Sequence, residues 1–233
     1  RPATCAWDLS GCGECGDSIV NGTEFCDVGP TGTCNVCVVD DTGPTGSYSF
    51  TNGSFFSSGY SVSSAGDVDN DGKAEVLIGA YGGYDAPSDT QQGITYLMLS
   101  SVIATQPAGY MFGLGTNASY RFVGEAYYDR AGSSVASTGD VDGDGFGDVL
   151  IGAYQWDVDT AMDSQEGKTY LLLSSAITSQ SSGHTFNLGT DASYSFVGEA
   201  PLDRSGVCVT SAGDVDSDGK ADLLIATTGT DEG

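Results

Sequence analysis

The feature that most constrains this chain is an acidic nine-residue segment that occurs three times. It reads Asp-Val-Asp-Asn-Asp-Gly-Lys-Ala-Glu over residues 67–75, and close variants occupy residues 140–148 and 214–222. Each copy has carboxylates at positions 1, 3, 5 and 9 and glycine at position 6. Carboxylates crowded in this way repel one another unless a cation lies among them. Hard oxygen ligands suit Ca²⁺, so three copies in register predict three calcium sites.

Position 7 of each loop is expected to donate a backbone carbonyl, which explains why its side chain varies. Glycine at position 6 is expected to permit the sharp turn, since it enters positive φ without strain. The alternative is a solvated acidic turn, because Asp and Gly are common in turns. The predicted ligands are Asp67, Asp69, Asp71, Lys73 and Glu75; Asp140, Asp142, Asp144, Phe146 and Asp148; and Asp214, Asp216, Asp218, Lys220 and Asp222.

The residues that follow each loop distinguish it from the calcium loop of an EF-hand. An EF-hand has a bidentate Glu at position 12 and lies between helices. Here position 12 is Ile78, Ile151 or Ile225, within a short apolar run that begins directly after the ninth residue. The pattern therefore predicts a loop that leads into a buried strand.

The acidic loops belong to a longer repeat, because their first residues lie 73 and 74 positions apart. In the second unit, strands are expected over residues 119–124, 132–137, 149–153 and 169–173. Four strands per unit with Gly, Ser and Asp turns are typical of a propeller blade. A lone blade cannot bury both faces, so blades must stack. The predicted fold class is therefore all-β, with β-propeller-type four-stranded blades.

The segment Phe-Val-Gly-Glu, followed by Gly-Ser-Ser-Val-Ala-Ser-Thr-Gly-Asp-Val-Asp-Gly-Asp-Gly-Phe-Gly-Asp-Val-Leu-Ile-Gly-Ala, resembles the FG-GAP repeat. That repeat builds the β-propeller of integrin α subunits and occurs in many secreted microbial proteins. The resemblance implies that each acidic loop binds calcium between two strands of a blade and stiffens the propeller. Two features depart from the pattern: insertions at residues 100–115 and 174–189, and an Asp-Arg pair present only in the second and third units. We interpret that pair, Asp129-Arg130 and Asp203-Arg204, as a structural ion pair.

About two and a half units are expected over residues 44–233, starting near residues 47, 119 and 193, with the last one incomplete. Propellers usually close with four to eight blades. The expectation is therefore either a part of a longer protein or blades completed between chains. Head-to-tail pairing that does not close would give a filament.

Residues 1–43 are predicted to form a separate small module. A segment with so few apolar residues needs disulfides or a metal to fold. Two Cys-x-x-Cys pairs, at residues 12–15 and 34–37, also fit a zinc-ribbon spacing. We favour three disulfides because they use all six cysteines, and the segment resembles a Cys-rich repeat of large secreted microbial proteins. The predicted disulfide cysteines are Cys5, Cys12, Cys15, Cys26, Cys34 and Cys37. The seventh, Cys208, is expected to be a small buried strand residue or to pair outside this chain.

The net charge of the chain limits the classes of partner that it can bind. The chain has 7 basic and 32 acidic residues, for a net charge of −25. Nucleic acid is excluded because its phosphates need the opposite charge, and no apolar run reaches membrane-span length. The expected location is the cell surface or the extracellular space. In a secreted eukaryotic protein, Asn21, Asn52 and Asn117 would be candidate glycosylation sites.

Catalysis has little support in the sequence. The single histidine, His184, falls in a variable insertion, and no nucleophile–base set recurs. We therefore expect no enzyme. The expected function is a calcium-binding extracellular adhesion or interaction module with a protein or glycan ligand. The alternative is a structural subunit of an extracellular filament, sheath or matrix whose partners are further copies of itself.

Overall fold

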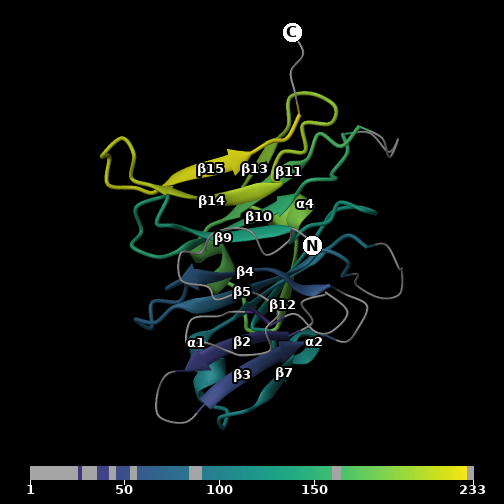
Figure 1. Ribbon diagram of the computed structural model, residues 1–233. Helices are drawn as coiled ribbons and strands as arrows, with labels where there is room; N and C mark the ends of the chain where they lie inside the picture. The colour runs from purple at the N-terminus through teal and green to yellow at the C-terminus, as the bar shows by residue number, and fades with distance from the viewer. Residues whose placement is uncertain are drawn as a thin grey trace.

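The computed structural model describes residues 26–27, 36–41, 46–52, 57–83, 91–158 and 164–229, with side chains from Tyr48 onward. These residues are mostly strands, with four short helices, and the sheets are stacked one above another (Figure 1). The predicted all-β class with propeller-like blades is confirmed. In the described part of the chain the sheets form an open stack.

Two sheets contain the central repeats, and each is built around a hairpin that carries an acidic loop. The order in one is β12-β8-β6-β5-β4, and in the other β13-β11-β10-β9. A third sheet has the order β1-β2-β3-β7, and the fourth is the hairpin β14-β15. The strand bounds are β1 Cys26–Asp27, β2 Val36–Asp41, β3 Gly46–Thr51, β4 Ser58–Gly66, β5 Glu75–Ala80, β6 Ile94–Met98, β7 Met111–Gly113, β8 Tyr120–Val123, β9 Ser134–Gly139, β10 Asp148–Ala153, β11 Lys168–Leu172, β12 His184–Asn187, β13 Tyr194–Val197, β14 Cys208–Gly213 and β15 Asp222–Ala226.

The sequence repeat and the sheet are offset by one strand. All four strands expected in the second unit exist, but the expectation that they share one sheet is wrong. The first of them, β8, pairs antiparallel with β6 in the preceding sheet, and its place in the next sheet is taken by β13. The strand that opens a unit therefore completes the previous blade. Sequence periodicity fixes the length of a repeat but not the partner of each strand.

The two insertions have the same structure and connect neighbouring sheets. The first contains α1 (Ser100–Ala104), β7 and α2 (Leu114–Asn117); the second contains α3 (Ser174–Thr178), β12 and α4 (Leu188–Asp191). Each insertion strand pairs in parallel with the outermost strand of the sheet before it, β7 with β3 and β12 with β8. The chain thus leaves one sheet, adds a strand to its neighbour and returns.

The apolar core lies between the sheets. One buried cluster joins Leu97 and Phe122 to Ile151 and Leu172 of the next sheet, with Phe186 from the second insertion. Such packing buries apolar area on both faces of the two central blades, which a single blade cannot do.

The predicted N-terminal module lies mostly outside the described residues. Cys5, Cys12, Cys15 and Cys34 fall there, as does Asn21. The backbones of Cys26 and Cys37 are paired in register between β1 and β2. Strand pairing then continues from β2 to β3, across the boundary expected after residue 43. The disulfides remain a prediction.

Candidate metal centres

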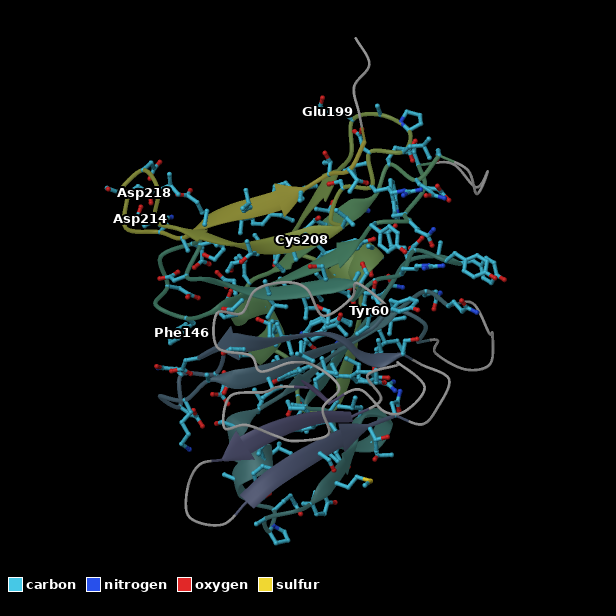
Figure 2. The ribbon with its side chains drawn as sticks, viewed as in Figure 1. Tyr60, Phe146, Glu199, Cys208, Asp214 and Asp218 are labelled. Atoms are coloured by element: carbon cyan, nitrogen blue, oxygen red, sulfur yellow. The ribbon has the colours of Figure 1, made fainter. Side chains whose placement is uncertain are left out.

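The three acidic loops occupy equivalent places in the stack. Each connects two antiparallel neighbours: β4 to β5, β9 to β10, and β14 to β15. Phe146 of the second loop lies on the same side of the stack as Asp214 and Asp218 of the third, whereas Glu199 lies at the other end of the strands (Figure 2). The strands therefore place all three loops along one edge of the molecule.

The first loop is held by its own carboxylates. Asp67 accepts hydrogen bonds from the backbone N–H groups of Asp71 and Gly72, at 3.1 and 3.0 Å. Glu75 Oε2 accepts one from the N–H of Val68 at 2.7 Å. Ligand oxygens of Asp67, Asp69, Asp71 and Glu75 lie within 4.8 Å of one another. Two oxygens on one Ca²⁺ are at most about 5 Å apart, because Ca–O distances are about 2.3–2.6 Å. The cluster therefore has a size that suits calcium.

Two oxygens of this loop have no partner of their own. Asp69 Oδ1 and Glu75 Oε1 are buried and make no hydrogen bond within the described structure. Burial raises the pKa of Glu75 to about 7, with Asp69 contributing by repulsion, and burial also raises the pKa of Asp69. A buried polar atom without a partner is unfavourable, and a cation would satisfy both oxygens. The donor set fits the predicted metal.

The second loop repeats this arrangement. Asp140 accepts from the N–H groups of Gly143, Asp144 and Gly145 at 2.6–3.0 Å. Burial acts to raise the pKa of Asp140, but these donors outweigh it and the pKa is lowered. Asp148 is fully buried and accepts from the N–H of Val141 at 2.9 Å. The ligand oxygens of Asp140, Asp142 and Asp148 come together. The predicted ligand Asp144 lies outside that group.

The third loop has the same internal bonds in a more open setting. Asp214 accepts from the N–H groups of Asp218 and Gly219, both at 3.0 Å, and Asp222 accepts from Val215 at 2.7 Å. Asp214, Asp216 and Asp218 come together, but all three are exposed. The predicted ligand Asp222 lies outside this group. The carbonyls predicted at Lys73, Phe146 and Lys220 remain predictions.

The backbone explains the glycine at position 6. Gly72, Gly145 and Gly219 have φ of 82°, 92° and 90°. A second left-handed position was missed: loop position 4 also has positive φ. Asn70 has φ 61°, Gly143 has 87° and Ser217 has 64°. Only one of these three residues is glycine, so position 4 carries no residue pattern from which its positive φ could be predicted.

Two serines that support the loops were also missed. Ser100 Oγ donates to Asp71 Oδ2 at 2.5 Å, and Ser174 Oγ donates to Asp144 Oδ2 at 3.0 Å. The Ser174 N–H also donates to Asp148 Oδ1 at 2.8 Å. Each serine begins the short helix of an insertion, so the insertion clamps the loop of its own blade. The recurring Leu-Ser-Ser at residues 99–101 and 173–175 was the available signal.

The Asp-Arg pair is not an ion pair. Asp129 accepts from the N–H of Ala126 at 2.7 Å, and Asp203 accepts from Ala200 at 2.8 Å. Arg130 instead donates to Tyr154 Oη at 2.8 Å and lies over the rings of Tyr81 and Tyr154. Arg204 Nε donates to Gln165 Oε1 at 3.0 Å. The interpretation as an ion pair was therefore wrong, although a structural role remains.

The other predicted sites lie apart from the loops. Asn52 Nδ2 donates to Tyr96 Oη at 2.6 Å, and Asn117 Oδ1 accepts from Gly113 at 2.9 Å. Their glycosylation remains a prediction. Cys208 is a free, half-buried thiol on β14. His184 lies on β12 with its ring edge against Phe186.

Comparison with protein families agrees with the repeated sheets. Residues 58–98 and 131–172 match the FG-GAP repeat. The chain carries two FG-GAP repeats. Each match runs through the first three strands of a blade and includes one acidic loop. FG-GAP repeats are typically extracellular. A search of curated proteins gives no match. Within the part of the chain that is described, the helices are too short or too polar to span a membrane.

Proposed function

We propose that this chain is a calcium-binding extracellular module in which calcium makes the FG-GAP blades rigid enough to present an adhesion or interaction surface. The observation that carries the proposal is the pair of buried, unpartnered oxygens on Asp69 and Glu75, within a cluster of four carboxylates. The proposal includes three calcium ions, one for each loop. It also includes the disulfide-rich N-terminal module, secretion, and the absence of catalysis.

Calcium would act as a cross-link within each blade. The first ligand of a loop directly follows one strand and the ninth is the first residue of the next, so one ion would join two neighbouring strands. In the first two blades the serine clamp extends this link to the insertion helix. Binding is expected in the weak range of about 10⁻⁴–10⁻³ M that is typical of extracellular modules. A ligand that binds only the folded state stabilises it by mass action.

The test compares the melting temperature and the number of bound calcium ions. The intact chain should bind three Ca²⁺ and melt at a higher temperature with 2 mM Ca²⁺ than with chelator. Glu75→Gln with Asp69→Asn, which keeps the side-chain shapes, should remove one ion and reduce the difference between the two melting temperatures. Phe146→Ala is the matched control, since position 7 acts through its backbone. Equal melting temperatures of the parent with and without calcium would refute the calcium sites.

A second candidate is a structural subunit of an extracellular filament. It is favoured by the apolar residues exposed on the last sheets, where Leu224, Tyr194 and Phe196 are exposed. Light scattering and electron microscopy of native material, with calcium and then with chelator, separate the candidates. Long particles that fall apart on chelation would favour the filament. Compact monomers in both conditions would favour the interaction module.

A further inference from the structure

A polar cavity of about 380 Å³ lies at the end of the strands opposite the acidic loops. Its walls come from the segment before β6, the turn between β8 and β9, and the segments that follow β10 and precede β11. Glu199, in the corresponding turn of the next repeat, lies at this end of the molecule (Figure 2). The lining residues are Gln91, Tyr128, Arg130, Gln155, Asp157 and Gln165. Ligand cavities usually measure about 300–1,000 Å³, so the space suits a small ligand.

Three of these side chains are already held in place by hydrogen bonds. Arg130 Nη1 donates to Tyr154 Oη at 2.8 Å. Asp157 Oδ1 accepts from the backbone N–H of Gln165 at 2.5 Å, and Gln165 Oε1 accepts from Arg204 Nε at 3.0 Å. A binding group that is fixed before the ligand arrives loses less conformational entropy on binding. The cavity is therefore preorganised on three sides.

Other polar groups of the lining remain free to bind a ligand. Among the residues that the structure describes, the side-chain amides of Gln91 and Gln155 make no hydrogen bond. The amide oxygen of Gln165 is turned toward Arg204, which leaves its nitrogen to donate. Each free amide offers two donors and one acceptor. The lining residues are all half-buried, so these groups are partly shielded from water.

The chemistry of the lining selects for hydroxyl groups. A hydroxyl both donates and accepts, so it can pair with an amide, a carboxylate and a guanidinium. None of the lining residues is aliphatic, which disfavours an apolar ligand. The charges of Arg130 and Asp157 balance, and the net charge of −25 repels anions. Tyr128 adds an aromatic ring, which accepts the apolar face of a sugar ring.

The backbone of the cavity shows which substitution will not disturb it. Left-handed backbone at non-glycine residues is uncommon and gathers at functional sites. Tyr128 has φ 67°, and the residue at the equivalent place in the next repeat, Leu202, has φ 69°. The turn therefore accepts leucine in this conformation, and Tyr128→Leu removes the ring without a change of backbone. Gln91, Arg130 and Gln165 also have positive φ, of 44°, 58° and 44°.

We propose that this cavity binds a neutral sugar residue of a glycan, with sugar hydroxyls on Gln155 and Asp157 and the apolar face of the sugar against Tyr128. The proposal names a ligand class for the interaction role proposed above, on which it rests. The acidic loops lie at the other end of the strands and share no residue with the cavity. Sugar binding and calcium binding can therefore be measured separately.

The first experiment applies the intact chain, in the presence of calcium, to an array of neutral oligosaccharides of glucose, galactose, mannose and N-acetylglucosamine. Sialylated and sulfated oligosaccharides are included on the same array. Binding to neutral oligosaccharides is expected, and the one with the strongest signal is then titrated into the chain by calorimetry. The absence of binding to every neutral oligosaccharide would overturn the proposal.

Substitutions in the cavity test the assigned contacts. Asp157→Asn keeps the shape of the side chain and should weaken binding of the neutral oligosaccharide about tenfold, as should Gln155→Ala. Tyr128→Leu should weaken it several-fold. Gln180→Ala is the matched control, since it removes a glutamine of the second insertion outside the cavity. The melting temperature of each variant shows that it is folded, and unchanged binding by the three cavity variants would reject the site.

The charge of the ligand gives an independent check. An acidic ligand held by Arg130 would bind more tightly to Asp157→Asn, because this change removes a negative charge from the same cavity. Tighter binding by that variant, or a preference for sialylated or sulfated oligosaccharides, would overturn the neutral-sugar proposal. A chain that calcium stabilises but that binds no neutral oligosaccharide would refute this proposal alone. A chain that binds the oligosaccharide but does not respond to calcium would refute only the calcium sites.

Discussion

The second and third repeats have similar sequences but different neighbours, and a few residues show the difference. Gly79 of β5 and Gly152 of β10 occupy equivalent positions. Each lies so close to the next repeat that a Cβ would be 2.0 Å from a carbonyl oxygen, that of Gly132 for Gly79 and that of Gly206 for Gly152. The equivalent residue of the third repeat is Ala226. An alanine there could not accept a neighbour packed in the same way.

A second position shows the same contrast. Ser61 Oγ accepts from the N–H of Val135 in the next sheet at 2.9 Å, and Ser134 Oγ accepts from Val209 at 3.0 Å. The third repeat has Cys208 at this place, and a thiol is a much weaker acceptor. The spacing of carboxylates and glycine in the acidic loop, by contrast, is the same in all three repeats. The loop chemistry is local to a hairpin, whereas the glycine and serine act only where another sheet packs against them.

The largest effect is expected from Gly152→Ala. The new methyl group would meet the carbonyl oxygen of Gly206, in the turn before β14, which cannot move aside without shifting that hairpin away from β10. The loss of unfolding free energy should be at least about 4 kcal/mol. Urea denaturation in saturating calcium measures it. Ala226→Gly is the comparison and should cost only about 1 kcal/mol, from backbone entropy. Similar losses for both changes would contradict the view that only the covered interface requires glycine.

The free energy of unfolding is expected to depend on pH through the buried carboxyl of Asp129. Burial raises the pKa of this carboxyl to about 7. The pKa of Asp129 is higher in the folded state than in the unfolded state, so the folded state is favoured while the carboxyl is protonated. The stability that this contributes below about pH 4 is lost as the pH rises toward 7, and the loss is on the order of 2–4 kcal/mol. Asp129→Asn should flatten the stability curve between pH 4 and 7. Urea midpoints across this range, at saturating calcium, test it; an unchanged slope would reject the assignment.

The ninth loop residue gives a more moderate contrast. Asp148 is fully buried and accepts from the N–H groups of Val141 and Ser174, whereas Asp222 is half-buried and accepts from Val215. At saturating calcium, where the repulsion among the loop carboxylates is neutralised, Asp148→Asn should lower stability by about 2 kcal/mol, because an amide replaces a buried carboxylate acceptor. Asp222→Asn should cost roughly half as much. Thermal melts of the two variants decide this, and an equal cost would mean that burial does not distinguish the loops.

The smallest effect is expected at loop position 4. Ser217 has φ 64°, a conformation that costs a non-glycine residue about 1 kcal/mol, and Gly143 already occupies the equivalent place. Ser217→Gly should raise stability by up to about 1 kcal/mol, and Gly143→Ser should lower it by a similar amount. The two changes should shift the melting temperature in opposite directions, upward for Ser217→Gly and downward for Gly143→Ser. Shifts in the same direction would show that the turn is not under strain.

Much of the candidate site was predictable because its chemistry is local. The acidic spacing placed Asp67, Asp69 and Glu75 together, and glycine at position 6 marked a turn with positive φ. The strands that flank each loop followed from short apolar runs. Ser100 and Ser174 were not assigned to the site, since each reaches its loop from 26 to 30 residues further along the chain. Only strand pairing brings those segments together.

The sequence by itself determined the repeat, the strands and the three carboxylate clusters, because side-chain periodicity and turn chemistry act over a few residues. The tertiary structure decided which strands share a sheet: β8 completes the blade before it, and β12 adds to the same edge in parallel. Backbone hydrogen bonding is nearly independent of sequence, so the pairing depends on how neighbouring blades bury their apolar faces. For the same reason, only the structure distinguishes the covered rings of Phe50 and Phe122 from the exposed ring of Phe196.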